Sequence, residues 1–181
     1  MNVLAQIFGA LALLFLVISY QQRKRINFLN LQASANIFYV LQYFVLHAYS
    51  GMISFIISTI KMIIFQIDER KNRTTNILVF IILEISFIFF GILTYDGLYS
   101  IIPILGACMF TYGAWQRNLK VTYFIAIIVA VMSNVYDIAV GAYISVISNL
   151  FELVASLIGF SKVCRGVVIK NNFHTIHTKT K

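Results

Sequence analysis

The basic residues of this 181-residue chain are confined to every second gap between its long apolar segments. All but one of the 14 Lys and Arg residues follow the first, third, fifth or seventh apolar segment, and the intervening gaps carry none. Short basic loops resist translocation and therefore stay on the cytoplasmic side of a membrane. The alternation predicts an integral membrane protein with seven spans, an N-terminus outside and a C-terminus in the cytoplasm.

The expected spans and basic clusters divide the chain into four parts. We expect helices over 3–20, 28–46, 50–67, 75–93, 98–115, 120–138 and 142–160. The basic clusters are Arg23, Lys24 and Arg25, then Arg70, Lys71 and Arg73, then Arg117 and Lys120, and in the tail Lys162, Arg165, Lys170, Lys179 and Lys181. The four parts are a first three-helix repeat (1–67), a cytoplasmic loop with a linker helix (68–97), a second repeat (98–160) and a basic cytoplasmic tail (161–181).

The composition favours a membrane protein over a soluble or nucleic-acid-binding one. Hydrophobic residues make up 60% of the chain and charged residues only 11%, whereas soluble domains carry about 25% charged residues. Since a spanning helix needs roughly 20 mostly apolar residues, seven spans leave no room for a soluble domain. The net charge of +8 is explained by loops that face anionic headgroups. The lipid bilayer is therefore the expected partner, and nucleic acid is not.

Similar residues recur in the same order along the first and last three segments. The pairs are Gly9-Ala10 with Gly106-Ala107, Asn36 and Tyr39 with Asn134 and Tyr136, and Ala48-Tyr49 with Ala142-Tyr143. The order predicts two parallel three-helix bundles joined by a linker helix, an all-α 3+1+3 plan in which both bundles have the same orientation. Chance similarity between apolar helices is the alternative explanation.

Part of the sequence resembles a known family. The run 18–25, the residues Gln32 and Asn36, the aromatic-rich segment 38–44 and the run 60–65 are similar to the YgjV-type bacterial inner-membrane protein family. That family is in turn similar to the SWEET and PQ-loop (MtN3-like) transporters. The resemblance implies a multi-pass protein of the bacterial inner (plasma) membrane with the 3+1+3 plan of those transporters.

The resemblance is incomplete at the positions that give PQ-loop proteins their name. Those proteins carry Pro-Gln at the ends of the first and fifth helices, where this chain has Tyr20-Gln21 and Trp115-Gln116. SWEET proteins use several helix prolines as hinges, and here Pro103 is the only proline. Alternating access would therefore need hinges of another kind.

Three ionisable side chains fall inside predicted spans, namely Lys61, Glu84 and Glu152. A charge at the bilayer centre costs about 2.5–3.5 kcal/mol on insertion scales, so such groups usually face the bundle interior and have a partner. We predict that Glu152 binds solute or a proton, and that Lys61 and Glu84 supply charge or proton coupling. A structural ion pair, or a lysine that snorkels to the headgroups, is the alternative. Asp137 is expected at a solvated outer helix end.

Amides and hydroxyls complete the predicted solute site. The substrate-binding candidates are Asn36, Asn134, Asn149, Glu152, Ser54 and Ser58. An amide both donates and accepts hydrogen bonds, which suits a polar solute. Because Asn36 and Asn134 hold related places in the two repeats, we expect them to face one cavity. Interhelical hydrogen bonding explains such residues equally well.

These observations favour a small-solute transporter or solute-binding membrane protein that works by alternating access. The alternative is a non-transporting membrane subunit or receptor that binds a protein partner or anionic lipid. We expect no enzyme, cofactor or metal site, because the sequence has no phosphate-binding glycine loop, no His-Glu-x-x-His motif and no cysteine pair with zinc spacing. A homodimer is compatible with so small a bundle.

Overall fold

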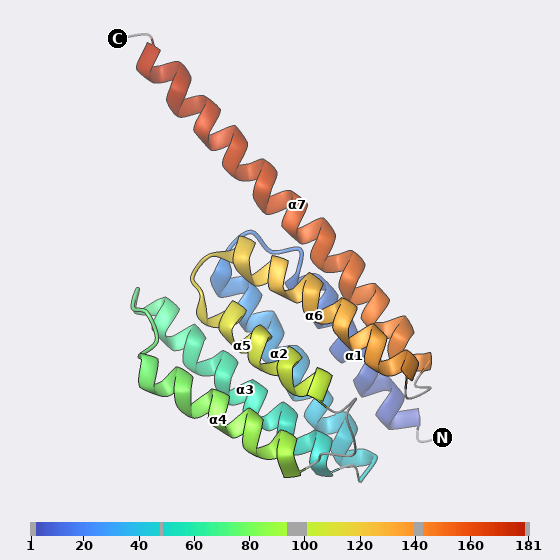
Figure 1. Ribbon diagram of the computed structural model, residues 1–181. Coiled ribbons are helices and arrows are strands. Elements are labelled where there is room, and N and C mark those ends of the chain that lie inside the picture. Colours follow the sequence, from blue (N-terminus) through green and yellow to red (C-terminus); the bar gives the residue numbers. More distant parts are fainter. Residues whose placement is uncertain (1–2, 48, 94–100, 140–142, 180–181) are drawn as a thin grey trace.

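The protein is an all-helical bundle, as the apolar segments predict (Figure 1). The computed structural model describes residues 3–47, 49–93, 101–139 and 143–179, with side chains at 49–51, 143–145 and 166–179 left out, and these ranges contain seven helices and no strand. The helices are α1 (Val3–Ser19), α2 (Arg25–Val45), α3 (Tyr49–Arg70), α4 (Ile77–Leu93), α5 (Ile101–Trp115), α6 (Leu119–Ala139) and α7 (Tyr143–Lys179). The bounds of the first six agree with prediction to within one helical turn.

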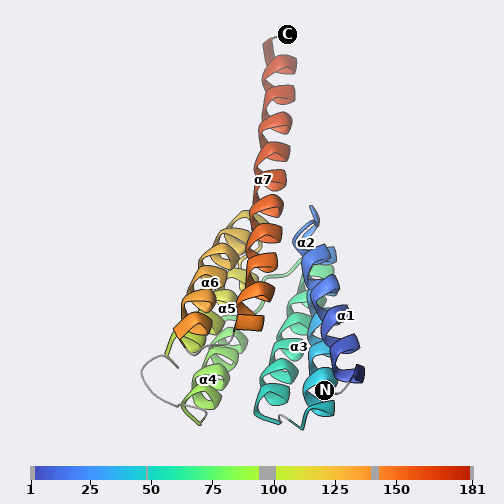
Figure 2. The same cartoon turned by 90° about the vertical axis from the view of Figure 1, so that its right-hand side faces the viewer.

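The exception is α7, which was expected to end near residue 160 and continues to Lys179. The physical reason is the lack of a stop signal. The segment 161–179 contains no proline, and Gly166 is its one glycine, whereas helices usually end at such residues. Figures 1 and 2 show the C-terminal part of α7 projecting beyond the other helices as one continuous rod.

The described helices differ in whether their length and apolar composition suffice to cross a membrane. Leu119–Ala139, with 21 residues, and the 20-residue segment Val146–Arg165 are long and apolar enough to cross a membrane by length and composition, and α1, α4 and α5 are apolar but shorter. The polar and charged residues of α2 and α3, such as Gln32 and Lys61, lower the apolar character of those two helices.

The helices pack mainly against their neighbours in sequence. Contacts join α1 to α2 and α2 to α3, and a second chain of contacts joins α4 to α5, α5 to α6 and α6 to α7. The two sets meet where α1 touches α7 and where α3 touches α4 and α5. Figure 2 shows α1, α2 and α3 on one side of the molecule and α4, α5 and α6 on the other.

The buried core lies near one end of the bundle. We call this the basic end, because the connections at 20–24, 71–76 and 116–118 lie there and carry most of the basic loop residues. Its centre is a cluster of three rings, Tyr20, Phe28 and Tyr123, whose centroids are 5.5 to 5.8 Å apart. All three side chains are at most 1% exposed. The helices are therefore packed most tightly at the basic end.

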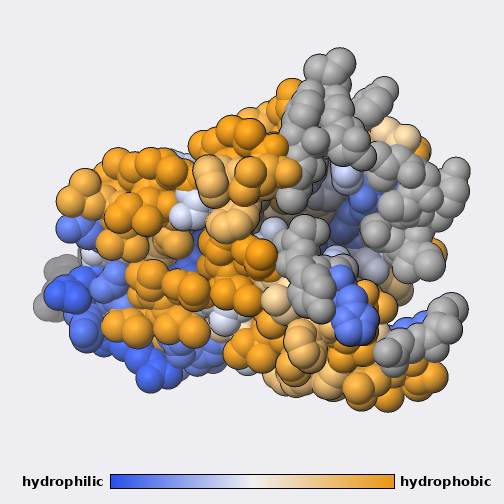
Figure 3. All heavy atoms as spheres, turned by 90° about the horizontal axis from the view of Figure 1, so that it is seen from below, coloured by the Kyte–Doolittle hydropathy of each residue, from blue (hydrophilic) through white to orange (hydrophobic). Residues whose placement is uncertain are grey.

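The outer surface is strongly apolar. Large hydrophobic residues are exposed along every helix, among them Ile85 on α4 at 59% and Phe151 on α7 at 56%. In the view of Figure 3, hydrophobic residues cover most of the surface and hydrophilic ones gather at one end. So large an apolar surface is unfavourable in water, and it is typical of a protein that contacts lipid or another protein.

Candidate functional site

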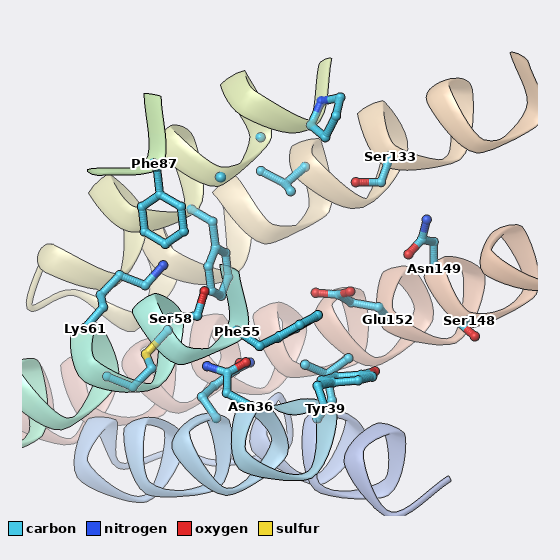
Figure 4. A pocket seen from close by; sticks show the side chains of 18 of the residues that line it. Asn36, Tyr39, Phe55, Ser58, Lys61, Phe87, Ser133, Ser148, Asn149 and Glu152 are labelled. Atoms are coloured by element: carbon cyan, nitrogen blue, oxygen red, sulfur yellow. The ribbon is translucent and has the colours of Figure 1, made fainter. Parts of the chain in front are cut away.

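A cavity of about 510 Å³ lies between the two sets of helices, and all seven helices contribute to its lining. Its polar lining residues are Gln32, Asn36, Tyr39, Gln42, Tyr43, Ser58, Lys61, Ser133, Ser148, Asn149 and Glu152 (Figure 4). The remaining lining is apolar and includes Phe55, Phe87 and Phe110. Cavities that bind small molecules typically measure 300–1,000 Å³ and combine an apolar lining with a few polar groups.

Several residues predicted from the sequence meet in this cavity. Asn36, Ser58, Lys61, Asn149 and Glu152 all line it, although they come from α2, α3 and α7. Ser54 lies one turn from Ser58 and lines a neighbouring pocket of about 410 Å³ on the side of α4 and α5. Ser54 therefore lines only the neighbouring pocket, whereas Ser58 lines both.

Asn134 and Glu84 do not line the main cavity. The Asn134 Nδ2 donates to the Ala130 carbonyl oxygen of its own helix at 2.9 Å, so the expectation that it faces the same cavity as Asn36 is not met. The reason is local, because the amide satisfies a backbone carbonyl one turn away. The Glu84 carboxyl has the Cys108 thiol as a hydrogen-bond partner, and its buried Oε2 has no hydrogen-bond partner.

Lys61 is only 2% exposed and does not snorkel to the surface. Its Nζ donates to the Thr111 Oγ1 at 3.2 Å, and that hydroxyl donates in turn to the Ala107 carbonyl oxygen. The ammonium also lies over the rings of Phe87 and Phe110, 4.7 and 5.4 Å from their centroids. Aromatic faces attract a cation when water is excluded. These contacts hold a positive charge at the cavity wall.

Glu152 places a carboxyl group on α7, and the environment of this group connects the cavity to the basic end. The Tyr20 hydroxyl, from the buried ring cluster, donates to the Glu152 Oε1 at 2.6 Å. The carboxyl also lines the cavity, and Figure 4 shows it pointing into the open space beside Phe55. The Glu152 side chain therefore contacts both the cavity and the packed core.

Asn149 lies one turn from Glu152 on α7 and has a partner that the sequence did not suggest. Its Nδ2 donates to the Asp137 Oδ2 at 2.7 Å. Asp137 lies two residues before the end of α6, as expected, and it also orients a cavity amide. The bond also joins α6 to α7.

Between the cavity and the basic end, polar groups are paired with one another. The Gln32 Nε2 donates to the Ser19 Oγ at 3.0 Å, and the Tyr123 hydroxyl donates to the Gln22 carbonyl oxygen at 2.7 Å. The Gln21 side chain bonds the Ala155 carbonyl oxygen and the Lys162 ammonium. These bonds tie α1 to α2, α6 and α7.

A charged cluster fastens α2, α3 and α5 at the basic end. The Glu69 Oε2 accepts a hydrogen bond from the Arg117 Nε at 3.2 Å and forms an ion pair with Arg25, whose Nε lies 3.3 Å away. The Arg25 guanidinium also donates to the Ala114 carbonyl oxygen at the end of α5. Arg25 is 8% exposed, so Glu69 balances a largely buried positive charge.

Several cavity residues on α2 other than Asn36 were not among the predicted site residues, although their spacing places them on one helix face. Gln32, Asn36, Tyr39 and Tyr43 are spaced by four, three and four residues, which places them on one face of α2, and all four line the cavity. Thr111 gave no such signal, because it is one hydroxyl in an apolar helix, and only the packing of α3 against α5 brings Lys61 to it.

An apolar exterior around a polar interior cavity is the arrangement of a helical membrane protein, since exposed helices in lipid must satisfy their backbone internally. Comparison with known families agrees. The model of the Imp-YgjV family, described as a bacterial inner membrane protein, matches residues 3–166, and the chain belongs to this family. No curated protein and no solved structure matches the chain.

Proposed function

We propose that this protein binds a small polar solute in the cavity and moves it across the inner membrane by alternating access. The seven helices would all span the bilayer, with the basic end in the cytoplasm as the charge bias of the loops requires. The proposal is one of binding and movement, without catalysis.

One observation carries the proposal: the polar cavity is blocked toward the basic end. The lining reaches Tyr43 and Ser148, near the ends of α2 and α7 that lie away from the basic end, and on the side of the basic end it reaches Leu16, Gln32 and Met62. Beyond these residues lie the Tyr20, Phe28 and Tyr123 rings and the paired polar groups. The cavity therefore belongs to one half of the bundle, which is what one state of an alternating-access cycle requires.

The arrangement of the helices supports a rocking motion between two units. The helices α1–α3 form one contiguous set and α5–α7 lie within the other, and the contacts between the sets are fewer than those within them. We expect the 3+1+3 plan of the SWEET and PQ-loop transporters, with α4 as the linker. Parallel repeats related by an axis along the membrane normal are one known transporter design.

The residues then divide by role. Asn36, Asn149, Ser58 and Glu152 contact the solute, and Lys61 supplies a charge at the same site. Ser54 contacts it only if the neighbouring pocket joins the cavity during the cycle. Asn134 bonds to its own helix in the state described, and Glu84 lies near enough to Lys61 to influence its charge.

Accessibility labelling tests whether water reaches the cavity. Single cysteines at Asn36→Cys and Glu152→Cys, in a background without Cys108 and Cys164, would be treated with a membrane-impermeant thiol reagent from each side in turn. We expect labelling from the side opposite the basic end. The matched control is Ile85→Cys, on the apolar outer face of α4, which lipid should shield from the reagent.

The same labelling separates the transporter from the alternative of a non-transporting subunit or receptor. That alternative is favoured by the long projecting α7 and by exposed basic side chains such as Arg73, at 65%, which suit a partner or anionic lipid. Absence of labelling at both cavity positions in folded protein, or labelling from the basic side alone, would contradict the proposed outward-facing cavity and favour the alternative.

A further inference from the structure

The cavity is lined by one basic and one acidic side chain that make no direct contact with each other. Lys61 and Glu152 both line it, and within the described residues no carboxylate oxygen lies within 4 Å of the Lys61 ammonium and no basic nitrogen lies within 4 Å of the Glu152 carboxyl. Figure 4 shows the two side chains on opposite sides of Ser58 and Phe55. Separated charges in a membrane interior are costly unless a partner satisfies them.

Each charge has unused hydrogen-bonding capacity. An ammonium has three N–H donors. The Lys61 ammonium donates one hydrogen bond to Thr111 and lies over two aromatic rings. The Glu152 Oε1 accepts from Tyr20, and no described hydrogen bond reaches Oε2. The hydrogen bonds with Thr111 and Tyr20 orient the Lys61 ammonium and the Glu152 carboxyl without neutralising them. This is expected of groups that bind a charged ligand.

The space between the charges suits an organic solute. Phe55 stacks on Tyr39 with ring centroids 4.7 Å apart, and Tyr43 lies 5.3 Å from the same ring. These rings lie beside Glu152 and offer an apolar surface to a side chain and π-faces to an ammonium. The Asn36 amide, which makes no hydrogen bond among the described residues, faces the cavity as a further donor and acceptor.

We infer that the solute is a zwitterion of the amino-acid class, with its carboxylate on Lys61 and its ammonium on Glu152 and the neighbouring rings. A neutral polyol would leave both charges unsatisfied, and a simple acid or amine would satisfy only one. The inference rests on the proposed function, because it names the solute for the same cavity.

Equilibrium binding to the full-length protein in lipid nanodiscs tests the inference. The probes are the common L-amino acids and γ-aminobutyrate, each tested singly, with analogues that lack one charge. For leucine the analogues are 3-methylbutylamine, without the carboxylate, and 4-methylpentanoate, without the ammonium; xylitol is the neutral probe. We expect at least one amino acid to bind about tenfold or more tightly than both of its analogues, because each loses a charged hydrogen bond.

Two variants then assign each charge to its partner. Lys61→Met should weaken amino-acid binding by about tenfold to a hundredfold and leave binding of the matched amine unchanged. Glu152→Gln, which keeps an acceptor for Tyr20, should weaken amino-acid binding by a similar factor and spare the matched acid. Lys71→Met, in an exposed loop, is the matched control and should bind as the unaltered protein does. If Lys61 and Glu152 had only a structural role, each variant would not keep its binding of the analogue that lacks the corresponding charge while it loses amino-acid binding.

The outcomes separate this inference from the proposed function. If xylitol or a singly charged analogue binds as tightly as every amino acid tested, or no amino acid binds while the cavity cysteines are labelled, the zwitterion assignment is overturned and the solute cavity stands. If nothing binds and the cysteines are not labelled, both fail. Because the panel is run first on the unaltered protein, a variant that does not fold leaves the conclusion intact.

Discussion

The polar groups at the basic end of the bundle and those in the cavity differ in how they are paired. At the basic end, the Glu69 carboxylate pairs with Arg25 and Arg117, and Tyr123 donates to the backbone of the connection after α1. In the cavity, Lys61 and Glu152 bond to the hydroxyls of Thr111 and Tyr20, and neither forms a direct ion pair among the described residues. The difference indicates that the polar groups of the basic end hold the helices together, whereas those of the cavity are available to a ligand.

The largest expected effect comes from breaking the closest contact at the basic end. A Cβ added at Gly159 would lie 1.9 Å from the Tyr20 carbonyl oxygen, which belongs to the backbone and cannot rotate away. Gly159→Ala should therefore destabilise the protein by about 3 kcal/mol or prevent folding, since overpacking typically costs 1–3 kcal/mol even where side chains can adjust. Thermal unfolding in detergent measures the effect.

The matched control for that variant is Gly106→Ala, where the new Cβ would meet Val129 at an ordinary 3.4 Å. It should change the unfolding temperature little. Equal destabilisation by the two variants would show that the basic end is no more tightly packed than the cavity half, and the comparison between the ends would fail.

A smaller effect is expected from removing the anion of the charged cluster. Glu69→Gln should cost about 2 kcal/mol, because it leaves the buried Arg25 and its neighbour Arg117 without a counter-charge. Asp68→Asn is the control, because its partner Arg73 has a side chain that is 65% exposed and exposed pairs contribute about 0–1 kcal/mol. Chemical denaturation of both variants gives the comparison, and a larger loss for Asp68→Asn would contradict it.

The smallest effect concerns the bond that joins the two ends. Tyr20→Phe removes the hydroxyl that donates to Glu152, with an expected loss of about 1 kcal/mol. The control Tyr112→Phe removes a hydroxyl that makes no hydrogen bond among the described residues and should be nearly neutral. If the two variants unfold at the same temperature, the Tyr20 hydroxyl contributes nothing to stability.

The sequence predicted the elements well because the signals for them are local. Each apolar segment is long enough to indicate its own helix, and the basic clusters mark the connections at one end of the bundle. The end of α7 was predicted wrongly for the same reason, since the polarity of the tail suggested a loop while nothing in it breaks a helix. The polarity of a residue is a weaker guide to a helix end than the presence of a stop signal.

The candidate site was predicted only in part. Which side chains of a helix point into the cavity depends on the rotation of that helix about its axis, and the sequence does not give this rotation. Asn36 and Asn134 hold similar places in the sequence, but one lines the cavity and the other bonds to its own helix. The pairing of Asn149 with Asp137 joins two helices, and the bond of Tyr20 to Glu152 joins residues 132 positions apart. Neither could be derived from spacing within one helix.

The contact of Gly159 with Tyr20 also has a mechanical consequence. There α1 and α7 meet backbone to backbone, with no side chain between them, so the contact can serve as a fulcrum close to the basic end. The 17-residue α1 extends about 25 Å from that point, so a tilt of about 10° would carry its far end about 4 Å while the contact stays almost fixed. In the proposed transport cycle, this contact would give the end of the bundle far from the basic end the larger displacement.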